Sequence, residues 1–386
     1  MTTENARNDG YVYLDHAATS PRRPEARAAM APFESGMFAN PSGSHRFARE
    51  ARRAVDEARE TVAAAIGCTP GEIVFTSGGT EGANAAVLGA VRRHGGTAVC
   101  SATEHHAVLH CVEHVDGRTV PVTARGPVDT DALRTVLAGV DDVSVVSVMA
   151  VNNETGVIND MQAVSHAVRG RAERAILHTD AVQAACWLDL RTVWPHVDVL
   201  TLSAHKFGGP KGMGVMVVRD GTTLEPLILG GGQERDRRSG THNVAGIVGT
   251  AAALRTTDDA RATETVRTAA LRDELVRQLT TRIPNASATV DPADCVAGTA
   301  HVCLEGMESE SLLYLLDTAG VCVSAASACA SGAMEPSHVL AAMGVPRSRM
   351  MGSLRFSLGH TTTRHDIDAA VEATVAAAER LAGARR

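Results

Sequence analysis

Three apolar stretches that end in polar side chains place the strongest constraint on the fold of this chain. They cover residues 143–156, 175–183 and 198–206. Nearly continuous apolar runs of this kind are typical of strands that are buried on both faces of a parallel sheet. Ligands of open α/β sheets bind outside the carboxyl ends of the strands. We therefore expect Asn153, Asp180 and Lys206, which lie near these ends, at one rim of the sheet.

The rest of the pattern divides the chain into two parts. An amphipathic helix is predicted for residues 46–66, and a strand, a glycine turn and a helix are predicted for residues 72–91. From about residue 265, helices alternate with short strands, which favours a smaller α+β domain. The predicted fold class is α/β, with a large domain built on a mostly parallel sheet flanked by helices. The predicted boundaries are 20–264 for the large domain, and 1–19 with 265–386 for the small domain.

Composition excludes several classes of protein. The net charge of -7 argues against direct binding of nucleic acid, which requires a basic face. No apolar run approaches the roughly 20 residues that cross a bilayer, and the first ten residues lack the apolar stretch of a signal peptide. We therefore expect no membrane contact and a cytoplasmic location. The eight cysteines form no CxxC pair, which suggests neither disulfides nor a metal site.

Lysine is almost absent from the chain. Of 37 lysine and arginine residues, only Lys206 and Lys211 are lysines, and both lie in the segment "SAHKFGGPKG". Arginine can replace lysine as a charge, but it cannot lose its proton and act as an amine. The retention of Lys206 after a strand therefore predicts a Schiff base with an aldehyde cofactor, followed by proton abstraction by the released amine. Lys211 is interpreted as structural or as a minor charge near a phosphate.

Two other segments allow more than one interpretation from their residues alone. The glycine turn Ser77–Glu81 between a strand and a helix suits a phosphate, but from its residues alone a tight turn without a ligand is the favoured interpretation. Asp180 at a strand end is either a helix N-cap or the partner of a protonated heterocyclic nitrogen. Both alternatives stay open at this level.

Cys329 has a sequence setting unlike that of the other cysteines. It lies in "SAASACASGAMEPS", a segment of small, polar and flexible residues. A cysteine on such a loop can act as a nucleophile, whereas a cysteine in a core is usually inert. We therefore predict a mobile loop at about 324–336 with the Cys329 thiol as a nucleophile.

The motifs resemble those of the fold-type I pyridoxal-phosphate enzymes. More narrowly, they resemble the cysteine desulfurases of the NifS/IscS type, in the class V aminotransferase family. The resemblance extends from "YLDHAATSP" (13–21) to "SLRFSLGHTTTRHDID" (353–368). Between them lie "FTSGGTEGAN", "TEHHAV", "VNNETG", "HTDAVQ", "SAHKFGGPKG", "RRSGTHN" and "SACASGAMEPSHVL". The last of these is similar to the long-loop group of the family.

The resemblance implies a role for each matching residue. Lys206 would bind the aldehyde of pyridoxal 5'-phosphate and move the substrate's α-proton. His105 would stack on the cofactor ring and, as a further catalytic residue, assist proton transfers. Asp180 would pair with the ring nitrogen, and Gln183 would lie near the ring oxygen. The residues implied at the phosphate are Gly79, Thr80, Ser203 and His205, with Thr241 supplied by the other subunit of a homodimer. Asn153 and Arg355 would receive the substrate carboxylate. From their residues alone, His105 and Arg355 would be read as surface side chains.

The implied activity is that of a cysteine desulfurase. L-Cysteine would give L-alanine and a persulfide on Cys329, which passes to a sulfur acceptor or scaffold protein. The sequence leaves open which pathway uses this sulfur: iron–sulfur cluster assembly, with transfer through Cys329, tRNA thiolation or DNA phosphorothioation. The alternatives are a selenocysteine lyase or a related aminotransferase of the same fold, and a non-catalytic scaffold. Gly208, Asp236 and Ala326 differ from the residues that are common at these positions in the family. We expect these differences to affect loop motion and partner preference and not the reaction.

Overall fold

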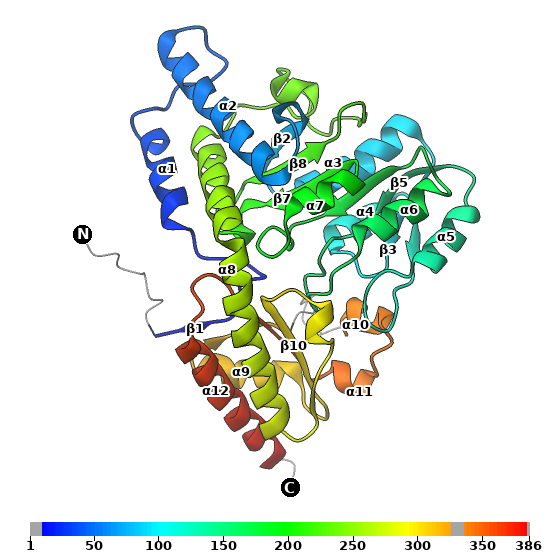
Figure 1. Cartoon of the computed structure of the whole chain (residues 1–386), viewed down its shortest axis with the longest axis vertical. Helices are drawn as coiled ribbons and strands as arrows, with labels where there is room; N and C mark the ends of the chain where they lie inside the picture. Colours follow the sequence, from blue (N-terminus) through cyan, green and yellow to red (C-terminus); the bar gives the residue numbers. More distant parts are fainter. Residues whose placement is uncertain (1–9, 326–335, 384–386) are drawn as a thin grey trace.

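A seven-stranded sheet forms the centre of the computed structural model, which describes residues 10–325 and 336–383 (Figure 1). Its strand order is β2-β8-β7-β6-β5-β3-β4, and only β8 runs antiparallel to its neighbours. The strands are β2 (Ile73–Thr76), β3 (Thr97–Ser101), β4 (Arg118–Val120), β5 (Val143–Ser147), β6 (Ile176–Asp180), β7 (Val199–Ser203) and β8 (Gly214–Val218). The predicted α/β class with a mostly parallel sheet is therefore confirmed.

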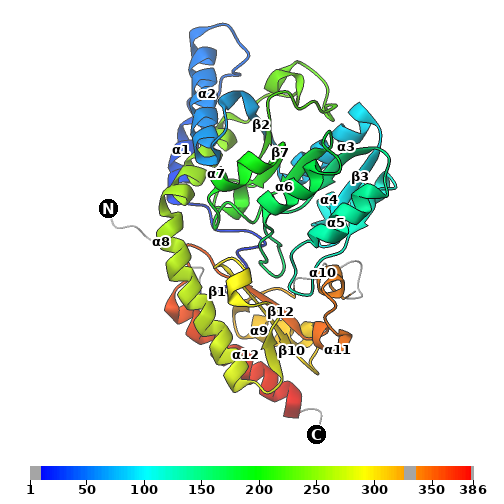
Figure 2. The ribbon, with the colours of Figure 1, turned by 45° about the vertical axis from the view of Figure 1, so that its right-hand side comes forward.

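Helices cover both faces of this sheet (Figure 2). Successive side chains of a strand point to opposite faces. Accordingly, Met216 and Val218 of β8 pack in the same cluster as α3 (Gly79–His94) and α4 (His106–His114), whereas Val215 and Val217 pack in the cluster on the other face. The helices of that other face include α5 (Thr130–Ala138), α6 (Met161–Arg169) and α7 (Leu190–Val193).

A second core lies below the large sheet. Its strands are β9 (Ala286–Ala288), β10 (Thr299–Leu304) and β12 (Ser353–Ser357) in an antiparallel sheet, and the parallel pair β1 (Val12–Tyr13) and β11 (Val321–Cys322). Its helices are α9 (Ser309–Thr318) and α12 (Arg364–Gly383), whereas α10 (His338–Ala342) packs in a separate small cluster with Val122 and α11 (Arg347–Met350) contacts β10. Leu14 packs here with Val302 and Phe356, so the N-terminal strand joins the C-terminal part of the chain.

One long helix, α8 (Val244–Arg282), runs through both parts (Figure 1). Its first half packs against α1 (Pro24–Glu34) and α2 (Arg46–Ile66), and its second half contributes Leu275 to the second core. A Cβ atom on Gly249 would lie 2.6 Å from the side chain of Met30, so glycine lets α1 and α8 approach closely. The predicted domain boundary between residues 264 and 265 falls inside α8, and the division into two domains stays a prediction.

The local predictions agree with the structure to different degrees. The helix predicted for residues 46–66 is α2. The strand predicted for residues 143–156 is β5, which already ends at Ser147, and Asn152 folds the residues that follow it into a hydrogen-bonded turn. Within residues 10–325 and 336–383, none of the helices combines the length and the apolar character that a bilayer crossing needs.

Candidate active site

A cavity of about 260 Å³ lies at the carboxyl ends of β6 and β7. Of the predicted site residues that the structure describes, all except Thr241 line this cavity. Those lining residues are Gly79, Thr80, His105, Asn153, Asp180, Gln183, Ser203, His205, Lys206 and Arg355. They come from six segments of the chain, so the fold brings residues that are far apart in the sequence together in one cavity.

Lys206 ends a 3₁₀ turn (Ala204–Lys206) that directly follows β7. Its Nζ donates to the carbonyl oxygens of Ala17 at 2.5 Å and Ala18 at 2.9 Å. Burial lowers the pKa of Lys206 to about 8, and the charge of Arg355 adds to this effect. Near pH 8, a larger fraction of this amine is therefore neutral than of an ordinary lysine. An amine must be neutral to act as a nucleophile or a base.

Asp180 is the last residue of β6 and is buried at the floor of the same cavity. Its Oδ1 accepts a hydrogen bond from the Val182 backbone N–H at 2.9 Å. Burial raises the pKa of Asp180 to about 6, while the Val182 N–H and the charge of Lys206 oppose the rise. The alternative that Asp180 caps a helix is wrong, because residues 181–188 form turns. A buried carboxylate of this kind needs a cationic or N–H partner.

The turn before α3 offers backbone donors to the cavity. Gly79 and Thr80 are the first residues of α3, and the first N–H groups of a helix have no partner within it. A Cβ atom on Gly79 would lie 2.7 Å from a methyl group of Val182, so glycine keeps this turn close to the end of β6. Ser203 and His205 line the cavity beside it. The N-terminal end of a helix with such neighbours favours an anion such as a phosphate.

Two histidines at the cavity have lowered pKa values. His105 caps α4 through Nδ1, which accepts from the Ala107 N–H at 3.1 Å. Burial and the charge of Lys206 lower its pKa, and the neutral ring therefore carries its proton on Nε2. Burial, with the charges of Lys206 and Lys211, lowers the pKa of His205 to about 4. Both imidazoles are thus neutral near pH 7.

Arg355 enters the cavity from β12 of the second core. Its Nη1 donates to the carbonyl oxygen of Asn153 at 2.8 Å, and its Nη2 donates to Oδ1 of Asp15 at 2.9 Å. The Asn153 backbone is fixed in turn by Asn152, whose Oδ1 accepts from the N–H groups of the two residues after Asn153. The guanidinium is thereby held where it can receive a carboxylate.

Sequence reasoning missed several residues that shape this site. Asp15 and Asn152 hold Arg355 and its partner Asn153, and the carbonyl oxygen of Ala17 accepts from Lys206. Glu104 is fully buried, and its Oε1 accepts from the Met149 N–H at 2.6 Å. Only the adjoining motifs "YLDHAATSP", "TEHHAV" and "VNNETG" could have marked these residues.

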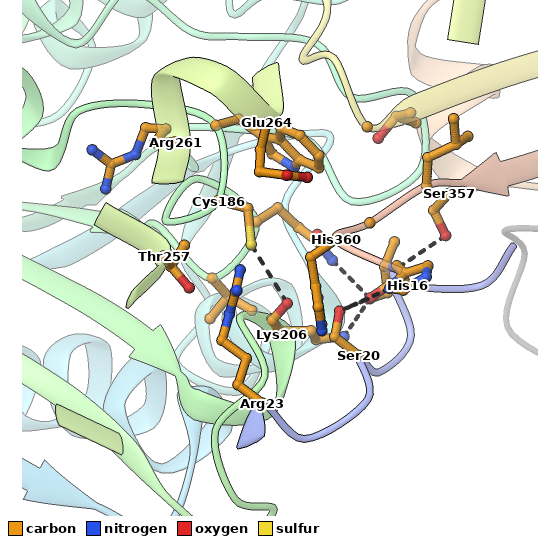
Figure 3. A pocket seen from close by; sticks show the side chains of 18 residues that line it. His16, Ser20, Arg23, Cys186, Lys206, Thr257, Arg261, Glu264, Ser357 and His360 are labelled. Carbon is orange, nitrogen blue, oxygen red and sulfur yellow. Dashed lines mark hydrogen bonds between the residues drawn. The ribbon is translucent and has the colours of Figure 1, made fainter. Parts of the chain in front are cut away.

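A second, smaller cavity of about 40 Å³ shares Ala17, Gln183 and Lys206 with the first (Figure 3). Its volume suits a few water molecules and not a cofactor. Cys186 faces it, and the Cys186 thiol donates to the carbonyl oxygen of Lys206 at 3.6 Å. Lys206 therefore borders both cavities.

The remaining two predicted residues differ in what the structure shows of them. Thr241 is exposed and does not line the cavity. Cys329 lies outside the described residues, as does Ala326. The other seven cysteines are free thiols, and burial raises the pKa of each one.

Comparison with known proteins gives the family of the chain. The family described as Aminotransferase class-V matches residues 12–370. The chain belongs to this family. A class V relative, the cysteine desulfurase IscS of Dictyoglomus turgidum, is 42% identical over 365 residues, which are 92% of this chain and 92% of the relative. Class V aminotransferases and their desulfurase members depend on pyridoxal phosphate, so the predicted family and cofactor are confirmed.

Solved structures of the class V family superpose on almost the whole chain. A NifS-like protein has a TM-score of 0.88 at 32% identity, covering 96% of this chain and 99% of the other. SspA in complex with cysteine has a TM-score of 0.77 at 29% identity, covering 90% of this chain and 98% of the other. The donor set described above fits the cofactor of this family, because it combines an amine, a buried carboxylate and an anion-binding helix end.

Proposed function

We propose that the chain is a cysteine desulfurase that removes sulfur from L-cysteine with pyridoxal phosphate as its cofactor. The observation that carries this proposal is the single cavity that joins Lys206, Asp180, His105 and Arg355 at the end of α3. The names of the relatives bear out the predicted class of enzyme, since the sequence relative above is a cysteine desulfurase. SspA was solved with cysteine bound, which supports cysteine as the substrate.

Three residues of the cavity would take part in the chemistry at the cofactor ring and the substrate's α-carbon. When bound, pyridoxal phosphate supplies an aldehyde and an electron sink for the substrate's α-carbon. We propose that Lys206 binds this aldehyde and, once released, takes the α-proton from L-cysteine at Nζ. Asp180 would hold a proton on the ring nitrogen, because a buried carboxylate favours a cationic partner. His105 would lie against the ring.

The remaining cavity residues would position the cofactor and substrate. The phosphate would rest on the residues around the α3 end, namely Gly79, Thr80, Ser203 and His205. Gln183 would lie near the ring oxygen. Arg355 and Asn153 would orient the carboxylate of L-cysteine, for which a planar guanidinium offers two parallel N–H donors.

Cys329 would receive the sulfur. Its thiolate would form an S–S bond with Sγ of L-cysteine while the Sγ–Cβ bond breaks and its electron pair stays with the carbon skeleton. That skeleton takes up a proton and leaves as L-alanine, and Cys329 keeps the persulfide. The raised pKa values of the seven described thiols support this choice, because a protonated thiol is a poor nucleophile.

We further propose a homodimer in which Thr241 contributes to the phosphate site of the partner subunit. The exposed position of Thr241 outside its own cavity supports this, as do the exposed side chains of Phe38 and Leu229, which are 77% and 80% accessible. A sulfur acceptor or scaffold protein would then take the persulfide, in iron–sulfur cluster assembly or another thiolation. The cytoplasmic location stays a prediction.

The test uses holoenzyme with L-cysteine and a thiol reductant. Wild-type protein should release equal amounts of L-alanine and sulfide, and Cys329→Ser should lose both while its cofactor absorbance stays unchanged. Cys68→Ser, which removes a thiol far from the cavity, is the matched control and should keep activity. Keto-acid-dependent amino exchange without sulfide release would instead favour an aminotransferase, and a preference for selenocysteine would favour a lyase. Protein that fails to bind the cofactor would favour the scaffold.

A further inference from the structure

The carboxylate of Asp15 is the ionic partner of Arg355. Asp15 follows β1 and forms a bridge to Ser357, two residues beyond Arg355 on β12. Its Oδ1 accepts from Nη2 of Arg355 at 2.9 Å, where the two side chains are 22% and 7% exposed. Arg355, which is predicted to bind the substrate carboxylate, thus already pairs with one carboxylate of the chain itself.

The other groups near Arg355 do not cancel its charge in the same way. Burial lowers the pKa of His301 to about 3, and burial raises the pKa of Tyr13 to about 12, so both are neutral near pH 7. Burial raises the pKa of Glu154 to about 7, while the hydrogen bond from Ser337 Oγ and the charge of Arg355 oppose the rise, so this carboxyl is only partly ionised near pH 7, and its hydrogen bond comes from Ser337 and not from Arg355. Lys206 adds a cation to the cavity. Asp15 is therefore the anion that contacts the guanidinium and offsets it.

The hydrogen bonds of Arg355 leave room for both carboxylates at once. Each terminal nitrogen of a guanidinium carries two hydrogens. Among the described residues, Nη1 uses one for Asn153 and Nη2 uses one for Asp15, which leaves one hydrogen on each for an incoming ligand. Nε has no hydrogen-bond partner among the described residues. Substrate can consequently bind while Asp15 stays in place.

We propose that Asp15 sets the charge selectivity of the site: paired with Arg355, it favours amino acids with an uncharged side chain over those with a second carboxylate. The proposal rests on the carboxylate-binding role of Arg355 proposed above. A guanidinium with a counter-ion offers little net positive charge, so a ligand with one carboxylate gains its two hydrogen bonds. A ligand with a second negative charge gains no further attraction and is repelled by Asp15.

The experiment compares the binding of L-alanine and L-aspartate to holoenzyme, followed by the absorbance of the bound cofactor. In Asp15→Asn, the amide oxygen can still accept from Arg355, but the negative charge is gone. The ratio of Kd for aspartate to Kd for alanine should then fall about tenfold, and Asp15→Glu should restore the wild-type ratio. Asp131→Asn, which neutralises an exposed carboxylate on α5 (92% accessible), should leave the ratio unchanged.

Two further variants separate this inference from the function on which it rests. Arg355→Ala should weaken alanine binding, and normal alanine binding there would refute the proposed role of Arg355 itself. Where Arg355→Ala behaves as expected but Asp15→Asn keeps the wild-type ratio, the charge selectivity alone is overturned. Asp15→Ser removes the charge and the hydrogen bond together, so it should lower the ratio of Kd for aspartate to Kd for alanine and also weaken the binding of alanine. This variant keeps the test decisive if Asp15→Asn folds poorly.

Discussion

Replacement of Glu234 by glutamine should destabilise the fold by removing the charge at the centre of a buried cluster. Oε1 of Glu234 accepts from Arg59 Nη2 and from His242 Nε2, both at 2.7 Å. Oε2 accepts from Arg59 Nη1 and from the Phe75 N–H, both at 2.9 Å. A glutamine side chain has one oxygen, so its amide group would face at least one of these donors without being able to accept from it.

The expected magnitude follows from the pKa of Glu234. Burial alone would raise this pKa, but hydrogen bonds from His242 and Arg59 and the charge of Arg59 lower it from 4.5 to about 2. This difference corresponds to about 3 kcal/mol of stabilisation of the carboxylate. Breaking a buried ion pair by removing one partner costs a similar amount, about 3–5 kcal/mol. We therefore expect Glu234→Gln to lose about 3 kcal/mol of unfolding free energy at neutral pH.

Urea unfolding of the holoenzyme, followed by circular dichroism, measures this loss. Because the folded pKa is lowered, the stabilisation is fully present above pH 4.5 and disappears as the pH falls toward 2. The difference in unfolding free energy between wild type and Glu234→Gln should therefore become smaller as the pH falls from 4.5 toward 2. Glu57→Gln, which breaks the exposed pair with Arg53, is the control and should cost less than about 0.5 kcal/mol. If Glu234→Gln unfolds at the same urea concentration as Glu57→Gln, the reasoning is refuted.

Three other predictions concern single residues of the site and its loops. In the cofactor-free protein, acetic anhydride should label Lys206 half-maximally near pH 8, because burial lowers its pKa, and Lys211 gives an internal control peptide for mass spectrometry. Gly214→Ala should weaken cofactor binding at least about tenfold in an absorbance titration, because its Cβ would lie 2.6 Å from the backbone of Gly78 before α3. Asp236→Gly should raise the unfolding free energy by about 0.5 kcal/mol in urea, because Asp236 has a φ of 63° that glycine adopts without strain.

Each of these predictions has a result that contradicts it. A labelling midpoint of Lys206 above pH 10 would show that the cavity does not lower its pKa. Gly36→Ala adds a methyl group where nothing lies within 4 Å, so a similar effect on cofactor binding would remove the steric argument for Gly214. A loss of stability in Asp236→Gly would mean that the aspartate side chain contributes more than its backbone strain costs.

The parts of the fold that carry a periodic pattern could be predicted from the sequence. The helix α2 was found at its observed bounds because its apolar residues recur three and four apart. The first half of α8 was missed, because residues such as Gly246 and Gly249 are buried among Met213 and Met30 and leave no polar face to mark a helix. A helix that is buried on most sides has no amphipathic signal.

The candidate site could be predicted only where strand ends and motifs marked it. Asp180 and Lys206 follow apolar runs, so their meeting at one rim was expected from a parallel sheet. The contact between Asp15 and Arg355 joins residues 340 positions apart, and no local pattern encodes such a pair. The same is true of buried Glu104, whose Oε1 accepts from the Met149 N–H, 45 positions further along the chain.

The length of α8 has a geometric consequence for the enzyme. At a rise of 1.5 Å per residue, its 39 residues form a rod of about 58 Å. A tilt of about 5° around the Arg282 end would therefore carry the Val244 end through about 5 Å. Thr241 stands three positions before that end, so a small angular adjustment among β10, α12 and their neighbours would become an atomic-scale displacement at Thr241.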